Sequence, residues 1–135
     1  MDTQRPERLR QHPEQRFAGS RHQFDLAAEA QNLAGEVAAG QGGHRQQSLY
    51  KHGPTSVSLF LFERLTRLSP HRTKGIVMIH VLRGHLQVTA DGEAHDLRAG
   101  NLLVLAPEVQ HGVVAYEESQ MLLTVTLEPA ANAPE

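Results

Sequence analysis

Residues 75–107 read GIVMIHVLRGHLQVTADGEAHDLRAGNLLVLAP, and this stretch decides the fold class. It contains four short β-rich segments, 75–82, 84–90, 93–97 and 101–107, with turn residues between them. Asp91-Gly92 separates two alternating segments, which is a strong signal for a β-hairpin. No helical pattern of about 10–15 residues intervenes, so a parallel sheet built from βαβ units is excluded. The stretch therefore predicts an antiparallel sandwich or barrel.

The short-strand pattern continues on both sides of this stretch. Further strands are predicted at 45–52, 55–65, 111–116 and 121–127. Ahead of them, Asp25 opens a segment in which Leu26, Ala30, Leu33 and Val37 recur at helical spacing, and the glycines at 40, 42 and 43 are expected to end this short helix. We therefore expect a mobile tail over 1–20, a short helix and linker over 21–43, an all-β barrel over 44–127 and a disordered tail over 128–135.

Length and composition limit the class of protein. The chain has 135 residues, which fits one domain, and 13 basic against 15 acidic residues give a net charge of -2. This balance gives no reason to expect a nucleic-acid partner. There are no cysteines, which excludes disulfides and thiolate metal sites. The first fifteen residues lack an apolar signal region and no apolar run is long enough to cross a bilayer, so we expect a cytoplasmic protein with no membrane partner.

Several predicted strands are apolar on both faces, namely residues 59–62, 76–79, 102–105 and 121–123. A strand with one solvated face would alternate apolar and polar residues. The outer faces are therefore expected to be covered by the N-terminal helix or by another subunit, and we predict a homodimer built through the sheet. The alternative is that both faces belong to the core of a two-layer sandwich.

A first motif lies in residues 69–84, which read SPHRTKGIVMIHVLRG. From about residue 71 to residue 125 the chain resembles the cupins, a superfamily whose first motif is written G-x5-H-x-H-x3,4-E-x6-G. Counting back from Gly84 places Val77 at the glutamate position, and His71 and Thr73 at the two histidine positions. One of the three metal ligands of the motif is therefore kept.

The second motif begins at Gly100 and is written G-x5-P-x-G-x2-H-x3-N in the family. His111 stands at its histidine, whereas Pro107 is displaced by one position, Glu108 replaces the glycine and Ala115 replaces the asparagine. The resemblance implies an all-β cupin fold, the double-stranded β-helix or jelly-roll barrel, of the small single-domain bacterial type related to RmlC. The family includes metal dioxygenases, isomerases, sugar-binding sensors and storage proteins, so the resemblance specifies the fold and not the activity.

Strand geometry then predicts a ligand pocket. Side chains on a strand alternate between the two faces, so if Val77 points into the barrel, Ile79 and Val81 do as well and His80 points out. The predicted pocket joins these apolar side chains to the polar groups near the barrel mouth, and consists of His71, Thr73, Val77, Ile79, Val81 and His111.

The pair His71 and His111 is also the candidate metal site. Two imidazoles can bind zinc, nickel, iron, manganese or copper, but catalytic sites normally use three protein ligands. Val77 supplies no carboxylate and Thr73 is a poor ligand, so a third ligand would have to come from outside the first motif, for example from Glu63 or Glu108. Two interpretations stay open: a metal-free barrel with a degenerate site, and an unusual site for a divalent transition metal.

These observations favour a small-molecule-binding barrel with a degenerate metal site. The alternative is a metal-dependent cupin enzyme, of dioxygenase or isomerase type, that uses His71 and His111 with a third ligand from elsewhere. A third hypothesis is a regulatory partner protein that makes contact through its N-terminal helix or tail. Whether the protein is an enzyme is left open.

Overall fold

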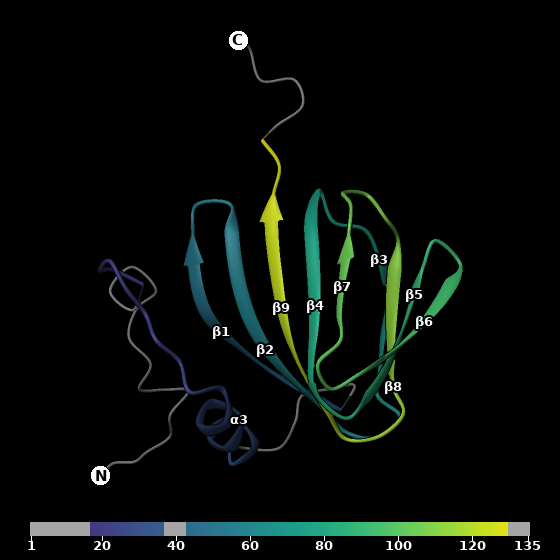
Figure 1. Ribbon diagram of the computed structural model, residues 1–135, viewed down its shortest axis with the longest axis horizontal. Coiled ribbons are helices and arrows are strands. Elements are labelled where there is room, and N and C mark those ends of the chain that lie inside the picture. The colour runs from purple at the N-terminus through teal and green to yellow at the C-terminus, as the bar shows by residue number, and fades with distance from the viewer. Residues whose placement is uncertain (1–16, 37–42, 130–135) are drawn as a thin grey trace.

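The described part of the chain folds into two antiparallel β-sheets that face each other, with one short helix against the larger sheet (Figure 1). The computed structural model describes residues 17–36 and 43–129. The five-stranded sheet has the order β1 (His44–His52), β2 (Thr55–Phe62), β9 (Ser119–Leu127), β4 (Gly75–Arg83) and β7 (Leu102–Leu105). The four-stranded sheet has the order β3 (Arg67–His71), β8 (His111–Ala115), β5 (His85–Ala90) and β6 (Glu93–Arg98). The all-β jelly-roll fold expected from the sequence is confirmed.

Alternation along β4 places the main core between the two sheets. Val77, Ile79 and Val81 are buried, whereas Ile76 and Met78 on the opposite face are exposed. The buried residues pack with apolar side chains from β2, β9, β5 and β8. The predicted orientation of this strand is therefore confirmed, including the outward position of the half-buried His80.

Two tight turns connect the central strands as the sequence predicted. The β5–β6 hairpin turns at Asp91 and Gly92, which both have positive φ angles, 49° and 83°. Such angles are typical of the type I′ turn, whose twist matches that of the flanking strands. Between β4 and β5, Gly84 has φ 91°, and a Cβ atom there would collide with Ser119 Oγ and the Glu118 carbonyl oxygen. This position therefore requires glycine for its conformation and for its close approach to β9.

The helix α3 (Leu26–Ala34) begins where the sequence predicted but ends earlier. The Asp25 side chain caps it by accepting a hydrogen bond from the Ala28 backbone N–H, at 3.1 Å. Gly35 is the C-cap, so the helix is one turn shorter than expected. The glycines expected to end it at 40 and 42, and Val37, lie outside the described residues.

This helix covers part of the outer face of the five-stranded sheet. Ala30 and Leu33 pack on Leu49, Leu59 and Leu61, which are the outward side chains of β1 and β2. The helix thus covers the apolar outer face of this half of the sheet, which is the first of the two coverings expected from the sequence.

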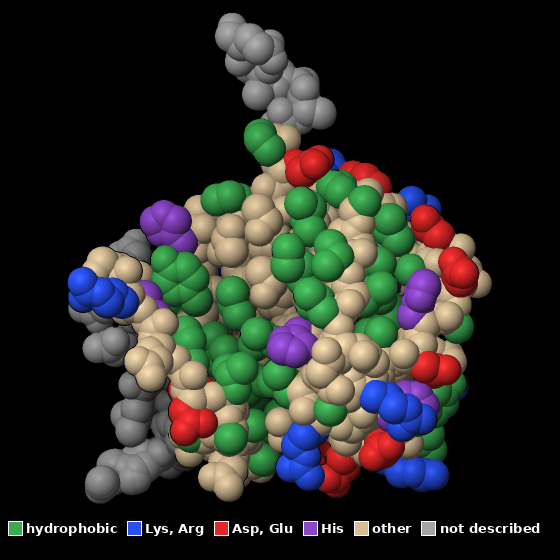
Figure 2. Space-filling model, in the orientation of Figure 1, with side chains coloured by type: hydrophobic (Ala, Val, Ile, Leu, Met, Phe, Trp, Pro, Cys, Tyr) green, Lys and Arg blue, Asp and Glu red, His purple; other side chains and the backbone are tan. Residues whose placement is uncertain are grey.

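The other half of the outer face, over β4 and β7, is not covered by the described residues. Four apolar side chains there form what we call the outer patch, and they are 37 to 57% exposed: Ile76, Met78, Leu102 and Val104. Met78 lies directly opposite Val104 in the β4–β7 pairing. Apolar side chains gather over β9, β4 and β7 in Figure 2. The chain does form two facing layers, but these four side chains are exposed and are therefore not part of the core between them.

The strand β3 is an element that the sequence reading missed. Arg67–His71 pairs with β8, with an irregularity between Leu68 and His71. Proline cannot donate to a ladder, yet it is tolerated on an edge strand such as β3, which has β8 as its one neighbour.

The ends of the chain are described only in part. The mobile tail expected over residues 1–20 lies mostly outside the described residues, as does the disordered tail expected over 128–135. Within the described part of the first segment, the Phe17 ring lies edge-on to Tyr50, with the ring centroids 5.8 Å apart. None of the described helices is long and apolar enough to span a membrane.

Candidate functional site

The antiparallel pairing of β3 with β8 brings His71 and His111 side by side. The two residues are direct partners in the register, although they are far apart in the sequence. Their ring centroids are 4.5 Å apart and the rings are tilted by 54°. His111 is buried, with 4% of its surface exposed, whereas His71 is exposed. The pair therefore links the interior of the barrel with its mouth.

Both imidazoles bond through the same nitrogen to a carbonyl two residues earlier. His111 Nδ1 lies 3.0 Å from the Val109 oxygen, and His71 Nδ1 lies 3.4 Å from the Ser69 oxygen. A carbonyl oxygen can only accept a hydrogen bond, so Nδ1 carries the proton in each ring. When a ring is neutral, its Nε2 is therefore a free acceptor, because the described part of the chain gives it no hydrogen-bond partner.

A cavity of about 120 Å³ adjoins this pair inside the barrel. Eleven residues line it, and three of these are polar: His71, Thr73 and His111. The apolar remainder comes from both sheets: Phe60, Leu68, Val77, Ile79, Val113, Met121, Leu123 and Val125. The cavity is thus mainly apolar, and two of its three polar residues, His71 and His111, are in ring contact.

Five of the six residues predicted for the pocket line this cavity: His71, Thr73, Val77, Ile79 and His111. Val81 is fully buried in the core and does not line it. The sequence reading missed the contributions of Phe60 and Met121. Both residues lie in strands that are apolar on both faces, so the sequence did not show which of their side chains point inward. It also did not show that β9 lies beside β4, with β2 on its other side. The role of the six residues in binding stays a prediction.

Hydrogen bonds join the segment after β3 to the segment after β7. The Glu108 backbone N–H donates to the Thr73 carbonyl oxygen at 2.9 Å, and Arg72 Nη1 donates to the Glu108 carbonyl oxygen at 3.2 Å. Glu108 has φ 70°, a left-handed conformation that favours glycine, and it is the position at which the second motif has glycine. Position 108 therefore adopts a conformation that suits glycine, although it carries glutamate here.

The donors at the barrel mouth do not make a three-ligand metal site. Within residues 17–36 and 43–129 no group of three His, Cys, Asp or Glu side chains is placed to hold a metal ion. Glu63 and Glu108, the two acids considered as third ligands, do not line the cavity. Two imidazoles and a neutral hydroxyl fall short of the usual catalytic set, so we derive no step through a metal.

A separate polar cluster lies on the outer face of the four-stranded sheet. His85 Nε2 donates to Asp96 Oδ1 at 3.0 Å, and Gln87 Nε2 donates to the same oxygen at 3.5 Å. The Tyr116 hydroxyl in turn donates to Gln87 Oε1 at 3.2 Å. The hydrogen bond from His85 is the main reason that the pKa of Asp96 lies below its ordinary value of 3.8. His85 is therefore a half-buried member of a hydrogen-bond network.

Comparison with known proteins agrees with this architecture. Residues 61–127 match a family described as Cupin domain. A cupin superfamily protein from Desulfitobacterium hafniense has a similar structure, with a TM-score of 0.67 at 18% identity over 84% of this chain and 96% of that one. A conserved protein of unknown function from Streptococcus pyogenes gives 0.66 at 23% identity, over 84% of this chain and 93% of that one.

A similar fold also occurs within a larger enzyme. Salicylate 1,2-dioxygenase from Pseudaminobacter salicylatoxidans gives a TM-score of 0.60 at 18% identity, over 75% of this chain and 30% of that one. At these identities the similarity concerns the fold alone. No curated protein matches the chain in sequence.

Proposed function

The chain carries a cupin domain over residues 61–127, and from this premise we propose that its barrel binds a small, largely apolar organic molecule. The observation that supports the proposal is the cavity of about 120 Å³, whose polar lining gathers at the His71–His111 pair. Apolar walls with a few polar groups on one side are the usual form of a small-molecule site, because burial supplies affinity and the polar groups fix orientation.

The volume limits the size of the ligand. An engineered apolar cavity of about 150 Å³ in another protein binds benzene, so a cavity of about 120 Å³ that opens at a mouth suits a single ring or a short branched chain. A neutral imidazole accepts at Nε2, and a protonated one donates there. A phenol can therefore donate to His111, and a carboxylate can bind when the ring takes up a proton. The proposed class is a small aromatic or branched molecule with one hydroxyl or carboxylate.

Titration with phenol and benzoate tests this proposal. We expect saturable chemical-shift changes in the methyl groups of Val77 and Ile79, and a loss of affinity of roughly tenfold or more in His111→Leu, because a hydrogen bond to a buried polar group is removed. His95→Leu, a histidine on β6 that does not line the cavity, is the matched control. Equal binding by both variants, or no saturable binding to the parent protein, would exclude a ligand oriented by His111.

A metal-dependent cupin enzyme is the second candidate, and the free Nε2 atoms favour it. Histidines that ligate metals usually donate their other ring N–H to a carbonyl or carboxylate, as both His71 and His111 do through Nδ1. A divalent transition metal would need a third protein ligand besides His71 and His111, and the described residues place none beside them. The test is metal content by mass spectrometry of the untagged protein beside the double variant His71→Ala/His111→Ala. Stoichiometric metal that disappears in the variant would favour the enzyme over the binding barrel.

We also propose that the protein forms a homodimer through the outer patch. Apolar side chains that stay exposed together on one sheet face are typical of an interface, and helix α3 already covers the neighbouring half of that face. In Val104→Lys the new charge opposes burial, and we expect sedimentation to show a monomer where the parent protein sediments as a dimer. Thr89→Lys, an exposed site on β5, is the control. A parent protein that is monomeric at high concentration would refute the dimer.

We further propose that the protein is cytoplasmic and that neither a nucleic acid nor a membrane is its partner, as the sequence led us to expect.

A further inference from the structure

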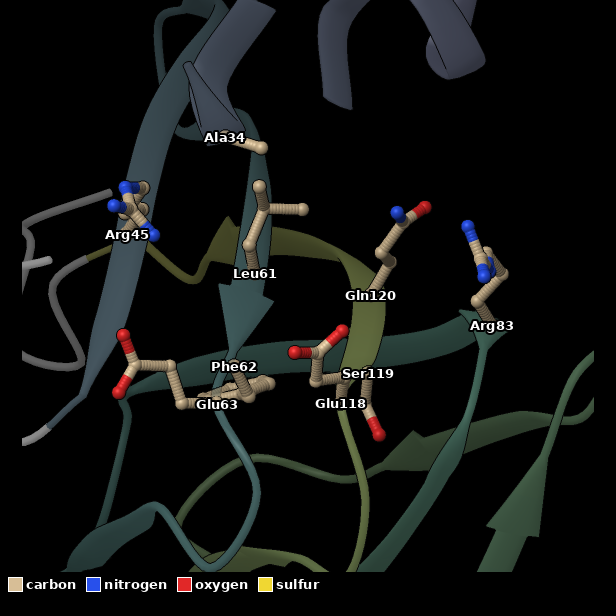
Figure 3. A pocket seen from close by; sticks show the side chains of 9 residues that line it. All are labelled: Ala34, Arg45, Leu61, Phe62, Glu63, Arg83, Glu118, Ser119 and Gln120. Carbon is tan, nitrogen blue, oxygen red and sulfur yellow. The ribbon is translucent and has the colours of Figure 1, made fainter. Parts of the chain in front are cut away.

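A second cavity lies outside the barrel, where the end of α3 meets β1, β2 and β9. Its volume is about 210 Å³, and it shares no lining residue with the barrel cavity. Nine residues of the described part of the chain line it, and four of these are charged, namely Arg45, Glu63, Arg83 and Glu118 (Figure 3). We call this cavity the polar cleft.

The charged groups of the polar cleft are unpaired. Within the described part of the chain, none of the four forms an ion pair or a side-chain hydrogen bond. Arg45 Nε is buried and has no hydrogen-bond partner. A buried donor without a partner is rare in folded proteins, because it has lost its bonds to water without gaining others. Nε itself is closed to solvent, so an acceptor in the cleft would meet the Nη groups of the same guanidinium, which also have no hydrogen-bond partner.

The arrangement of the charges suggests what that acceptor belongs to. In Figure 3, Arg45 and Arg83 stand on opposite sides of the cleft, and the Glu118 carboxylate reaches into the space between them. A dicarboxylate bound there would meet Glu63 and Glu118, and a diamine would meet the two guanidinium groups. A molecule with one charge of each sign avoids both repulsions, since the formal charge of the lining is balanced.

The remaining walls fit the same class of molecule. Helix α3 ends at Ala34, which lines the cleft, and the C-terminal end of a helix carries partial negative charge that favours a cation. Leu61 adds an apolar wall, and the Gln120 amide has no hydrogen-bond partner within the described residues. A volume of about 210 Å³ corresponds to roughly seven water molecules at about 30 Å³ each, which is enough for a compound of a few carbon atoms.

We propose that the polar cleft binds a small zwitterion of the amino-acid class. The guanidinium group of Arg45 binds the carboxylate, for which its planar fork of donors is suited. Glu118 binds the ammonium group. The polar cleft shares no lining residue with the barrel cavity, so this proposal does not depend on whether the barrel binds an organic ligand.

Nuclear magnetic resonance titration of the full, ¹⁵N-labelled chain tests this site. The probes are the common L-amino acids, one at a time, with succinate as a dicarboxylate and putrescine as a diamine. We expect at least one amino acid to give saturable shifts of the Arg45 Nε–H signal and of the backbone signals of 61–63 and 118–120. The signals of His71 and His111 should not move, and neither succinate nor putrescine should saturate over the same range.

Two variants and two controls complete the experiment. Arg45→Gln and Glu118→Gln should each weaken amino-acid binding by roughly 10- to 100-fold, the loss expected for a hydrogen bond to a charged group. Glu118 is exposed, so its substitution keeps the test valid if the Arg45 variant fails to fold. Arg98→Gln, an exposed arginine on β6, and His111→Leu should leave this binding unchanged. The proposal is overturned if no amino acid saturates up to about 10 mM, or if succinate or putrescine binds more tightly than every amino acid.

Discussion

Truncation of Leu33 to alanine should release helix α3 from the sheet without unfolding the barrel. Leu33 is 1% exposed and, with Ala30, forms the buried face of the helix. Removing a buried leucine side chain costs about 2–5 kcal/mol, whereas a nine-residue helix has little stability of its own in water. The contacts that remain come from Ala30, Leu26 and the hydrogen bond of Gln47 Nε2 to Glu29 Oε1, and we expect them to be too weak to offset a loss of that size. We therefore expect local release, and with it the loss of the polar cleft that the helix end helps to form.

Hydrogen exchange measured by mass spectrometry would reveal this release. A loss of about 2 kcal/mol or more corresponds to exchange of the α3 amides that is roughly 30-fold faster or more. Amides of β4, β5 and β8 should keep their rates, and the methyl signals of the barrel cavity should keep their positions. Gln31→Ala, on the exposed face of the same helix, is the matched control. Exchange that rises equally in helix and barrel would show that they unfold as one unit and would refute the reasoning.

Three further changes test the turns and the polar cluster. Gly84→Ala should lower the free energy of unfolding by more than about 3 kcal/mol in urea titration, because the new methyl group meets Ser119 at a positive φ angle. A loss below about 1 kcal/mol, the lower end of the cost of the φ angle alone, would contradict this. Glu108→Gly should raise that free energy by up to about 1 kcal/mol, since glycine adopts the left-handed conformation without strain, and a clear loss in thermal unfolding would speak against it. The lowered pKa of Asp96 stabilises the folded protein above the unfolded value of 3.8, and this contribution is lost as the pH falls through the lower folded value. Asp96→Asn should therefore make urea midpoints less sensitive to acid, and an unchanged pH dependence would rule out the hydrogen bond from His85 as its source.

The strands and turns could be predicted from the sequence because their signals are local. Alternation along residues 75–83 depends on strand geometry alone, and the Asp91-Gly92 hairpin depends on two φ angles that those residues readily adopt. Strand β3 lacks such a signal. Its proline is compatible with a strand only because β3 is at the edge of a sheet, and edge position is a property of the whole fold.

Most residues of the candidate site could be predicted from the sequence, but the extent of the cavity could not. Motif spacing brought His71 and His111 together as a hypothesis, and the structure places them as partners across β3 and β8. The sequence could not separate Val81 from Ile79, because both face inward and only the packing of the opposite sheet decides where the cavity ends. The polar cleft was not foreseen at all, since its charges come from four segments whose neighbours are set by the tertiary fold.

The hydrogen bonds that brace the barrel mouth have a consequence for evolution. The bond from the Glu108 backbone to the Thr73 carbonyl, and the bond from the His111 ring to the Val109 carbonyl, hold this region without any contribution from the side chain at position 77. Selection can therefore alter the donor set of the cavity while the scaffold persists. A single substitution, Val77→Glu, would add a carboxylate to a cavity that already contains two imidazoles. Such a substitution would give the cavity a third donor group without altering the hydrogen bonds named above.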